Sequence, residues 1–164
     1  MERELNLRLI LEILDKHHVL YILIGGLAAV THGSPFPTTD VDITPDRSRD
    51  NMERLSQALT ELDARIRVEG VPEGLPFNHD GDSLLNGEIW NLTTLYGDLD
   101  LTLIPSGTSG YEDLSRDCIT HQLLGVIVRI ASLADIIRSK QAANRPKDQR
   151  VLPTLRMILD RNTD

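Results

Sequence analysis

Apolar positions repeat along the first part of the chain with two different periods. Leucines and isoleucines three and four residues apart predict an amphipathic helix from residue 7 to about residue 17. The compact apolar run over residues 20–24 stops at a glycine pair, which predicts a buried strand. The same patterns predict a short helix over residues 27–32, a strand over 41–44 and a longer helix over 51–62.

The middle of the chain predicts a loop followed by a hairpin. A third strand is expected over residues 64–68. Residues 69–87 are rich in glycine, proline, asparagine and aspartate, so we expect a long surface loop there. Two strands over residues 89–95 and 99–104, joined by a turn at Tyr96-Gly97-Asp98, predict a β-hairpin.

The C-terminal part predicts one more strand and then two helices. After the strand, over residues 126–130, Ser132 with Asp135 three residues later forms a variant of the capping box at a helix start. Pro146 opens the last helix, and Pro153 is expected to kink or break it. The order of these elements predicts an α/β (α+β) fold with a mixed sheet and C-terminal helices.

Length and composition are those of one globular domain. The 164 residues fit a single domain over residues 1–164, whose helical part begins at about residue 132. The apolar runs are too short to cross a bilayer, and we expect neither a secretory leader nor a membrane partner. A single cysteine, Cys118, offers no internal disulfide and no zinc cluster. We therefore expect a cytoplasmic protein.

The charge is unevenly distributed. The net charge of -8 argues against a nucleic-acid footprint over the whole surface. From Arg129 to Asp164 there are 8 basic and 4 acidic residues, a balance of +4, and the remaining 9 basic and 21 acidic residues give -12. Such a chain could bind metal on an acidic wall and phosphate on a basic one, although two helices with solvated basic faces would give the same pattern.

Two short acidic motifs are candidates for chemistry. Asp40 and Asp42 are two residues apart in a predicted strand, so their carboxylates share a face. Asp98 and Asp100 form a similar pair, of which Asp100 lies deeper in the strand and Asp98 adjoins the predicted turn. We predict that Asp40, Asp42 and Asp100 bind Mg²⁺ (or Mn²⁺), because hard divalent cations prefer carboxylate oxygens and share sites with phosphates. Solvated acids at a strand end and at a hairpin are the plainer alternative.

Gly25 and Gly26 follow a predicted strand and open a predicted helix. Glycines there let the backbone approach a phosphate closely, and a helix N-terminus offers free N–H donors. A glycine pair alone usually marks a turn, but one followed by an acidic strand is more specific. Neither a G-x-x-x-x-G-K-[ST] loop nor a G-x-G-x-x-G fingerprint is present, which argues against P-loop and Rossmann sites.

These motifs together resemble a known family. Gly-Gly, then H-G, then T-x-D-x-D, and a later L-D-L strand are similar to the nucleotidyltransferase superfamily. The segments A-S-L-x-D-I-I-x-x-K and R-P-K-D resemble its branch of abortive-infection toxin-like bacterial nucleotidyltransferases. The resemblance spans Tyr21 to about Leu159, which is nearly the whole chain.

The resemblance implies a polymerase-beta-like core that binds a nucleoside triphosphate, such as ATP, with magnesium. It implies that Asp40 and Asp42 bind both metals and that Asp100 is the third carboxylate and general base. Many relatives carry an arginine after the H-G motif, where this chain has Phe36. The residues implied to contact the nucleotide are Gly25, Gly26, Thr38 and Lys140.

Several residues near these motifs have simpler interpretations. His32 is expected to bond to backbone at a helix end, and Trp90 is expected to pack in the core. Lys147 and Asp148 are expected to form a local ion pair in the first turn of the last helix. Lys140 could contact phosphate, or its side chain could extend along a helix surface toward water.

Three functions remain open from the sequence. The first is a metal-dependent nucleotidyltransferase that modifies an acceptor hydroxyl. The second is a catalytically weak or inactive nucleotide-binding or partner-binding protein on the same scaffold, for which Phe36 is the clue. The third is a toxin that modifies tRNA or a protein and pairs with an antitoxin, for which the basic C-terminal end is the support.

Overall fold

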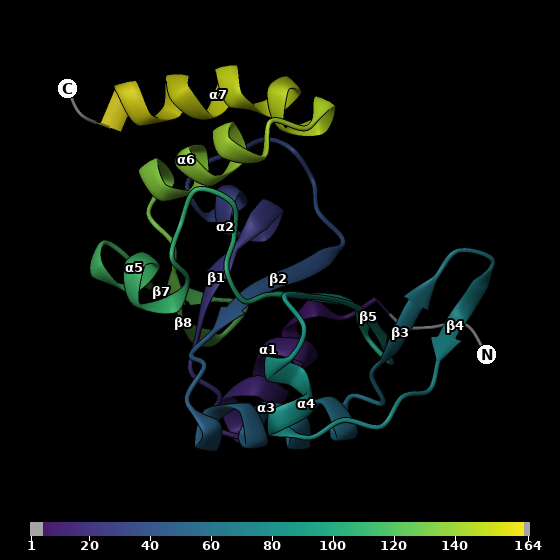
Figure 1. The fold of residues 1–164 in the computed structure, drawn as a ribbon. Helices are drawn as coiled ribbons and strands as arrows, with labels where there is room; N and C mark the ends of the chain where they lie inside the picture. Colours follow the sequence, from purple (N-terminus) through teal and green to yellow (C-terminus); the bar gives the residue numbers. More distant parts are fainter. Residues whose placement is uncertain (1–4, 163–164) are drawn as a thin grey trace.

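The computed structural model describes residues 5–162 and shows one mixed sheet between two groups of helices (Figure 1). The polar residues at the extreme N-terminus, where we expected no leader, lie outside this range. Its strands are β1 (Tyr21–Ile24), β2 (Asp40–Pro45), β3 (Arg65–Val68), β4 (Val71–Leu75), β5 (Ile89–Thr94), β6 (Gly97–Thr102), β7 (Ile119–Leu123) and β8 (Val126–Ile130). Its helices are α1 (Leu7–Lys16), α2 (Gly25–Thr31), α3 (Arg49–Glu61), α4 (Gly81–Leu85), α5 (Tyr111–Arg116), α6 (Leu133–Ala143) and α7 (Pro146–Asn162).

The eight strands form one sheet in the order β4-β3-β5-β6-β2-β1-β8-β7. Two neighbouring pairs are parallel, β2 with β6 and β1 with β8, and the others are antiparallel. The β2–β6 register places Asp42 beside Asp100. A mixed sheet with C-terminal helices confirms the fold class that the sequence predicts.

Helices cover the sheet from both sides. Figure 1 shows α1, α3 and α4 on one side and α2, α6 and α7 on the other. The apolar stripe of α1 is buried, with Ile10, Leu11 and Leu14 fully inaccessible to water, and so is that of α3. Burial of such stripes, at about 25 cal/mol per Å² of apolar surface, is the main source of stability for an amphipathic helix.

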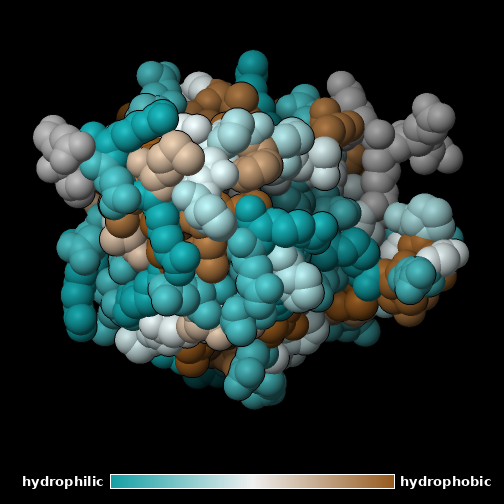
Figure 2. All heavy atoms as spheres, turned by 90° about the horizontal axis from the view of Figure 1, so that it is seen from above, coloured by the Kyte–Doolittle hydropathy of each residue, from teal (hydrophilic) through white to brown (hydrophobic). Residues whose placement is uncertain are grey.

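Seen from the side of α6 and α7, hydrophilic residues predominate, and hydrophobic ones occur at scattered positions (Figure 2). Among residues 5–162, no helix combines the length and the apolar character that a membrane crossing requires.

The prediction of a single long loop over residues 69–87 is wrong. This segment contains β4 and the short helix α4. Strand β4 is an edge strand with exposed side chains, so it lacks an apolar alternation. Helix α4 has only five residues and depends on a capping box between Asp80 and Ser83 and on the buried Leu84. Neither element is long or apolar enough to produce a periodic signal.

Two further elements, α5 and β7, lie between β6 and β8 and were not predicted. Strand β7 is at the far edge of the sheet, and four of its five residues are exposed. The β5–β6 hairpin is confirmed, but its turn lies earlier than expected. Gly97, with a φ of +135°, already belongs to β6, so Asp98 is a strand residue and not a turn residue.

The two C-terminal helices begin where the sequence predicts, with two corrections in detail. The Ser132 hydroxyl accepts a hydrogen bond from the Asp135 backbone N–H at 3.1 Å, but the Asp135 carboxylate binds Arg138 at 3.0 Å instead of completing a capping box. Helix α7 continues through Pro153, which therefore does not break it. Pro153 lies on the exposed side, where water can solvate the carbonyl that lacks a helical partner.

Asn51 of α3 ties the start of β1 to the end of β2. Its side chain is fully buried; it accepts from the Leu20 N–H at 2.7 Å and donates to the carbonyls of Leu20 at 2.9 Å and Asp46 at 2.7 Å. We expect Asn51→Ala to lower the free energy of unfolding by about 2 kcal/mol, because these buried backbone groups lose their partners. Urea denaturation measures the change. The exposed Asn78→Ala is the control, with an expected effect within about 0.5 kcal/mol.

Candidate active site

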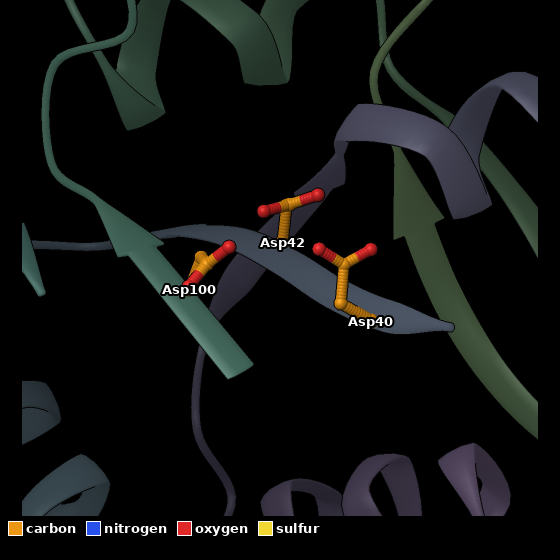
Figure 3. A group of neighbouring side chains, drawn as sticks. All are labelled: Asp40, Asp42 and Asp100. Atoms are coloured by element: carbon orange, nitrogen blue, oxygen red, sulfur yellow. The ribbon is translucent and has the colours of Figure 1, made fainter. Parts of the chain in front are cut away.

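Three aspartates converge where β2 and β6 lie side by side. Asp40 and Asp42 are on one face of β2, and Asp100 is the β6 residue beside Asp42. One carboxylate oxygen from each residue lies within 4.8 Å of the other two. Figure 3 shows the three carboxylates grouped together on one side of the two strands. The structure thus brings together three carboxylates that the sequence places in two separate segments.

The cluster concentrates negative charge in a partly buried place. Burial, and then the charges of Asp40 and Asp100, raise the pKa of Asp42 from its ordinary value of 3.8 to about 8. Burial also raises the pKa of Asp100, against the opposing effect of the Arg67 guanidinium. A divalent cation among these oxygens would relieve the repulsion. The donor set, three carboxylates from two strands, fits the oxygen ligands that Mg²⁺ and Mn²⁺ prefer.

The glycine pair leaves space for this cluster. Gly25 begins α2 with a φ of +74°, and a Cβ atom there would lie 2.8 Å from the Cβ and Cγ atoms of Asp42. A Cβ atom on Gly26 would lie 3.0 Å from the Thr38 hydroxyl oxygen. The Thr38 hydroxyl in turn donates to Asp40 Oδ1 at 2.8 Å. Both glycines therefore leave room for the side chains that form and orient the acidic cluster, a reason that the sequence pattern did not indicate.

A cavity of about 750 Å³ opens over the three carboxylates. The seven residues predicted as site residues all line it, including both glycines, Thr38 and Lys140. Phe36 also lines it and is 40% exposed. The cavity is large enough for a nucleotide, since ligand sites commonly measure roughly 300–1,000 Å³.

Three cations line the cavity from the side of α6 and α7. They are Lys140 of α6, Arg145 just before α7, and Lys147 of α7. The fully buried Asp148 accepts from Arg145 Nε at 2.7 Å, and its Oδ1 lies 3.7 Å from Lys140 Nζ. Although burial alone would raise it, the pKa of Asp148 is lowered by these hydrogen bonds and charges, so the side chain stays ionised.

This arrangement corrects one prediction and leaves another open. Asp148 pairs with Arg145 and Lys140 and not with Lys147, for which the described residues show no ion pair. Asp148 thereby holds two cations at the cavity that the acidic cluster also lines. Lys140 is 20% exposed in its side chain, and its ammonium group has Asp148 as a partner. Contact between Lys140 and phosphate stays a prediction.

Arg67 is a site residue that the sequence pattern did not indicate. From β3 it reaches past β5 and donates to Asp100 Oδ1 at 2.8 Å and to the Leu92 carbonyl at 3.0 Å, while its Nη1 lies 3.5 Å from Asp98 Oδ2. The alternation R-I-R-V placed Arg67 on one face of a strand. Only the sheet order, β3-β5-β6, brings that face to Asp100.

Two simpler interpretations are confirmed. A ring nitrogen of His32 lies 2.8 Å from the Ala131 carbonyl, so His32 ties the end of α2 to the segment after β8. Trp90 Nε1 donates to the Leu84 carbonyl at 2.9 Å, and its ring stacks on Phe77 with 5.9 Å between centroids. Both residues serve the packing around the site.

Stability without metal should depend on the ionisation of Asp42. In the folded protein the pKa of Asp42 is raised from 3.8 to about 8, so the fold favours the protonated side chain. The contribution of protonated Asp42 to the free energy of unfolding is fully present below pH 3.8 and is lost as pH rises through 8. Mg²⁺ bound to the ionised cluster should offset this loss. We expect the rise in Tm on adding Mg²⁺ to be several degrees larger at about pH 9 than at about pH 6.

Thermal melts with Mg²⁺ or with EDTA at both pH values measure this difference. Asp42→Asn is the control, since it removes the titrating group and should flatten the pH dependence of the Mg²⁺ effect. An equal Mg²⁺ effect at both pH values in the unaltered protein would contradict the prediction.

Comparison with known proteins identifies the fold. No family model matches the chain, and no curated protein matches it in sequence. Among solved structures, the lincosamide antibiotic adenylyltransferase LnuA with lincomycin bound is similar, with a TM-score of 0.62 at 16% identity over 96% of this chain and 99% of that one. A candidate nucleotidyltransferase from Thermotoga maritima is also similar, with a TM-score of 0.54 at 16% identity over 94% and 91% of the two chains. The chain therefore has the nucleotidyltransferase fold.

Proposed function

We propose that the protein is a metal-dependent nucleotidyltransferase, which moves a nucleotidyl group from a nucleoside triphosphate to an acceptor hydroxyl. The observation that carries this proposal is the acidic cluster of Asp40, Asp42 and Asp100 in one cavity with Lys140 and Arg145. Two walls of opposite charge suit a substrate that needs both divalent cations and a direct cationic contact to its phosphates.

Different residues of the cavity have different roles in the proposed reaction. Asp40, Asp42 and Asp100 would hold Mg²⁺ ions, which neutralise the triphosphate and activate the acceptor hydroxyl when bound. The acceptor oxygen forms a bond to the α-phosphorus, the bond to pyrophosphate breaks, and Asp100 accepts the hydroxyl proton. Lys140, Thr38 and the Gly25-Gly26 backbone would contact the triphosphate.

Asp148 supports this function without touching the substrate. Its carboxylate is fully buried and binds both Arg145 and Lys140, so it sets where the two cations present their charge. ATP is the first nucleotide to test, because the similar protein LnuA is an adenylyltransferase. A reaction of nucleoside triphosphates also favours the cytoplasm.

Phe36 favours a second candidate function, a nucleotide-binding or partner-binding protein that turns over slowly or not at all. It places an aromatic ring at the cavity, at the position where the resemblance implies an arginine. The three cations on the α6–α7 side argue for the enzyme instead, because they supply positive charge from a different element. A toxin role, with tRNA or a protein as acceptor and an antitoxin as partner, rests on the C-terminal motifs and basic end alone.

Labelled nucleotides separate the enzyme from the binder. Purified protein is incubated with Mg²⁺ and each α-labelled nucleoside triphosphate in the presence of cell extract, and pyrophosphate release and label transfer are measured. Transfer of label with release of pyrophosphate is the expected result. Calorimetric binding of a triphosphate without pyrophosphate release, across all extract fractions, would favour the binder.

A further inference from the structure

The sheet beside Asp100 continues the cavity through three uncharged side chains. In the β5–β6 register, Asn91 lies opposite Asp100, and Ile89 lies opposite Thr102. Residues two apart in a strand share a face, so these side chains extend the surface that carries Asp100. We name Ile89, Asn91 and Thr102 the β5–β6 shelf; all three line the cavity.

The shelf is open and partly apolar. Ile89 is 59% exposed, Asn91 is exposed, and Thr102 is half-buried. An exposed isoleucine alone needs no explanation. Here it lies in a cavity, beside an amide and a hydroxyl that can both donate and accept hydrogen bonds, and Phe36 adds a second exposed apolar side chain to the lining. Apolar surface with a few polar groups is the usual make-up of a small-molecule site.

The charges around the shelf do not suit a polyanion. Three cavity cations, Lys140, Arg145 and Lys147, belong to the α6–α7 side. The cation nearest the shelf is Arg67, and its guanidinium is already bound to Asp100 and lies close to Asp98. A phosphodiester backbone on the shelf would therefore meet Asp98 and Asp100 and a single cation that these aspartates already neutralise, whereas protein–RNA contacts depend on Lys and Arg at the phosphates.

We propose that the β5–β6 shelf binds the acceptor, and that the acceptor is a small hydroxyl compound with an apolar portion and no phosphate group. This inference rests on the proposed function, because it is Asp100, as the proton acceptor, that fixes where the reacting hydroxyl lies. The apolar portion packs on Ile89, and polar groups of the acceptor bond to Asn91 and Thr102. The acceptor oxygen becomes bonded to the α-phosphorus, its proton passes to Asp100, and pyrophosphate leaves.

The first test compares two acceptor pools. The protein is incubated with Mg²⁺ and α-labelled ATP, and in parallel with each other nucleoside triphosphate. One pool is total RNA, and the other is an ultrafiltered, RNase-treated small-molecule extract. Label in the small-molecule pool is expected. Label in RNA, or on a protein, would overturn this inference and leave the proposed transferase function intact. No label in either pool, with no pyrophosphate released, would overturn both.

The second test uses a matched pair of substitutions. Ile89→Lys places a charge on the shelf, whereas Ile127→Lys makes the same change at a residue of β8 that is 72% exposed and does not line the cavity. With the small-molecule pool diluted in series, Ile89→Lys should lower labelling at limiting acceptor by about tenfold or more. Ile89→Lys should leave the KM for the nucleotide and the Tm as in the unaltered protein. Ile127→Lys should also leave both values unchanged.

The split between the two substrates makes this result specific. A merely structural role of Ile89 would lower the Tm or raise the KM for the nucleotide as well. Equal labelling by Ile89→Lys and Ile127→Lys at limiting acceptor would overturn the assignment of the shelf.

Discussion

Asp42→Asn is expected to reduce Mg²⁺-dependent nucleotidyl transfer by about a thousandfold or more. Asp42 is the central member of the cluster, since it is beside Asp100 in the sheet and shares a strand face with Asp40. An amide keeps the shape of the side chain but removes a negative charge that metal ions require. The loss should appear in kcat, measured as pyrophosphate release at saturating triphosphate.

The same substitution should not unfold the protein. Burial and two neighbouring carboxylates already raise the pKa of Asp42 to about 8, so the ionised side chain destabilises the metal-free fold. We expect Asp42→Asn to have an unchanged or higher Tm without metal above about pH 8. Such a result would show that activity, and not folding, depends on this charge.

Asp98→Asn is the matched control. Asp98 lies on β6 two residues from Asp100, but it is not part of the acidic cluster and its side chain is 41% exposed. We expect a loss of activity below about threefold, because its contact with Arg67 is an exposed ion pair. If the two variants lost activity equally, or if Asp42→Asn kept full turnover, the assignment of the metal ligands would be wrong.

Gly25→Ala is expected to lower the free energy of unfolding by about 3 kcal/mol and to remove most of the activity. A φ of +74° alone disfavours alanine by about 1–2 kcal/mol. The added Cβ atom would also collide with the Asp42 carboxylate, which must then move out of the cluster. Urea denaturation gives the stability, and pyrophosphate release gives the activity.

Gly70→Ala separates these two effects. Gly70 has a similar φ of +82°, but no atom lies within 4 Å of the position of its Cβ. It should therefore show only the backbone effect, about 1–2 kcal/mol, with normal activity. Equal destabilisation by the two substitutions would mean that Asp42 does not limit the space at Gly25.

The elements that were predictable are those whose burial leaves a local periodic pattern. Helices α1 and α3 each turn one apolar stripe to the core, and β1 is buried along most of its length. Each of these elements can therefore be predicted from the pattern of a few consecutive residues. Strand β7 and helix α4 carry no such pattern, because one is an exposed sheet edge and the other is a single capped turn. Their formation depends on neighbours that are distant in sequence.

The candidate site shows the same division. The D-x-D spacing and the glycine pair are local, and they were sufficient to nominate Asp40, Asp42 and Gly25. Asp100 could be nominated from its own apolar alternation, but its place beside Asp42 follows from the parallel β2–β6 register. Arg67 could not be nominated at all, since its contact with Asp100 requires the order of three strands. Sheet order is a property of the whole chain.

The parallel pairing of β2 with β6 has a consequence for synthesis on the ribosome. Asp42 and Asp100 are neighbours in the sheet although 58 positions (100 − 42) separate them in the chain. A nascent chain in which β2 has been synthesised but β6 has not therefore carries only part of the acidic cluster. Lys140 is translated later still. We expect growing chains to be unable to consume triphosphates until residue 140 has been added and α6 has formed.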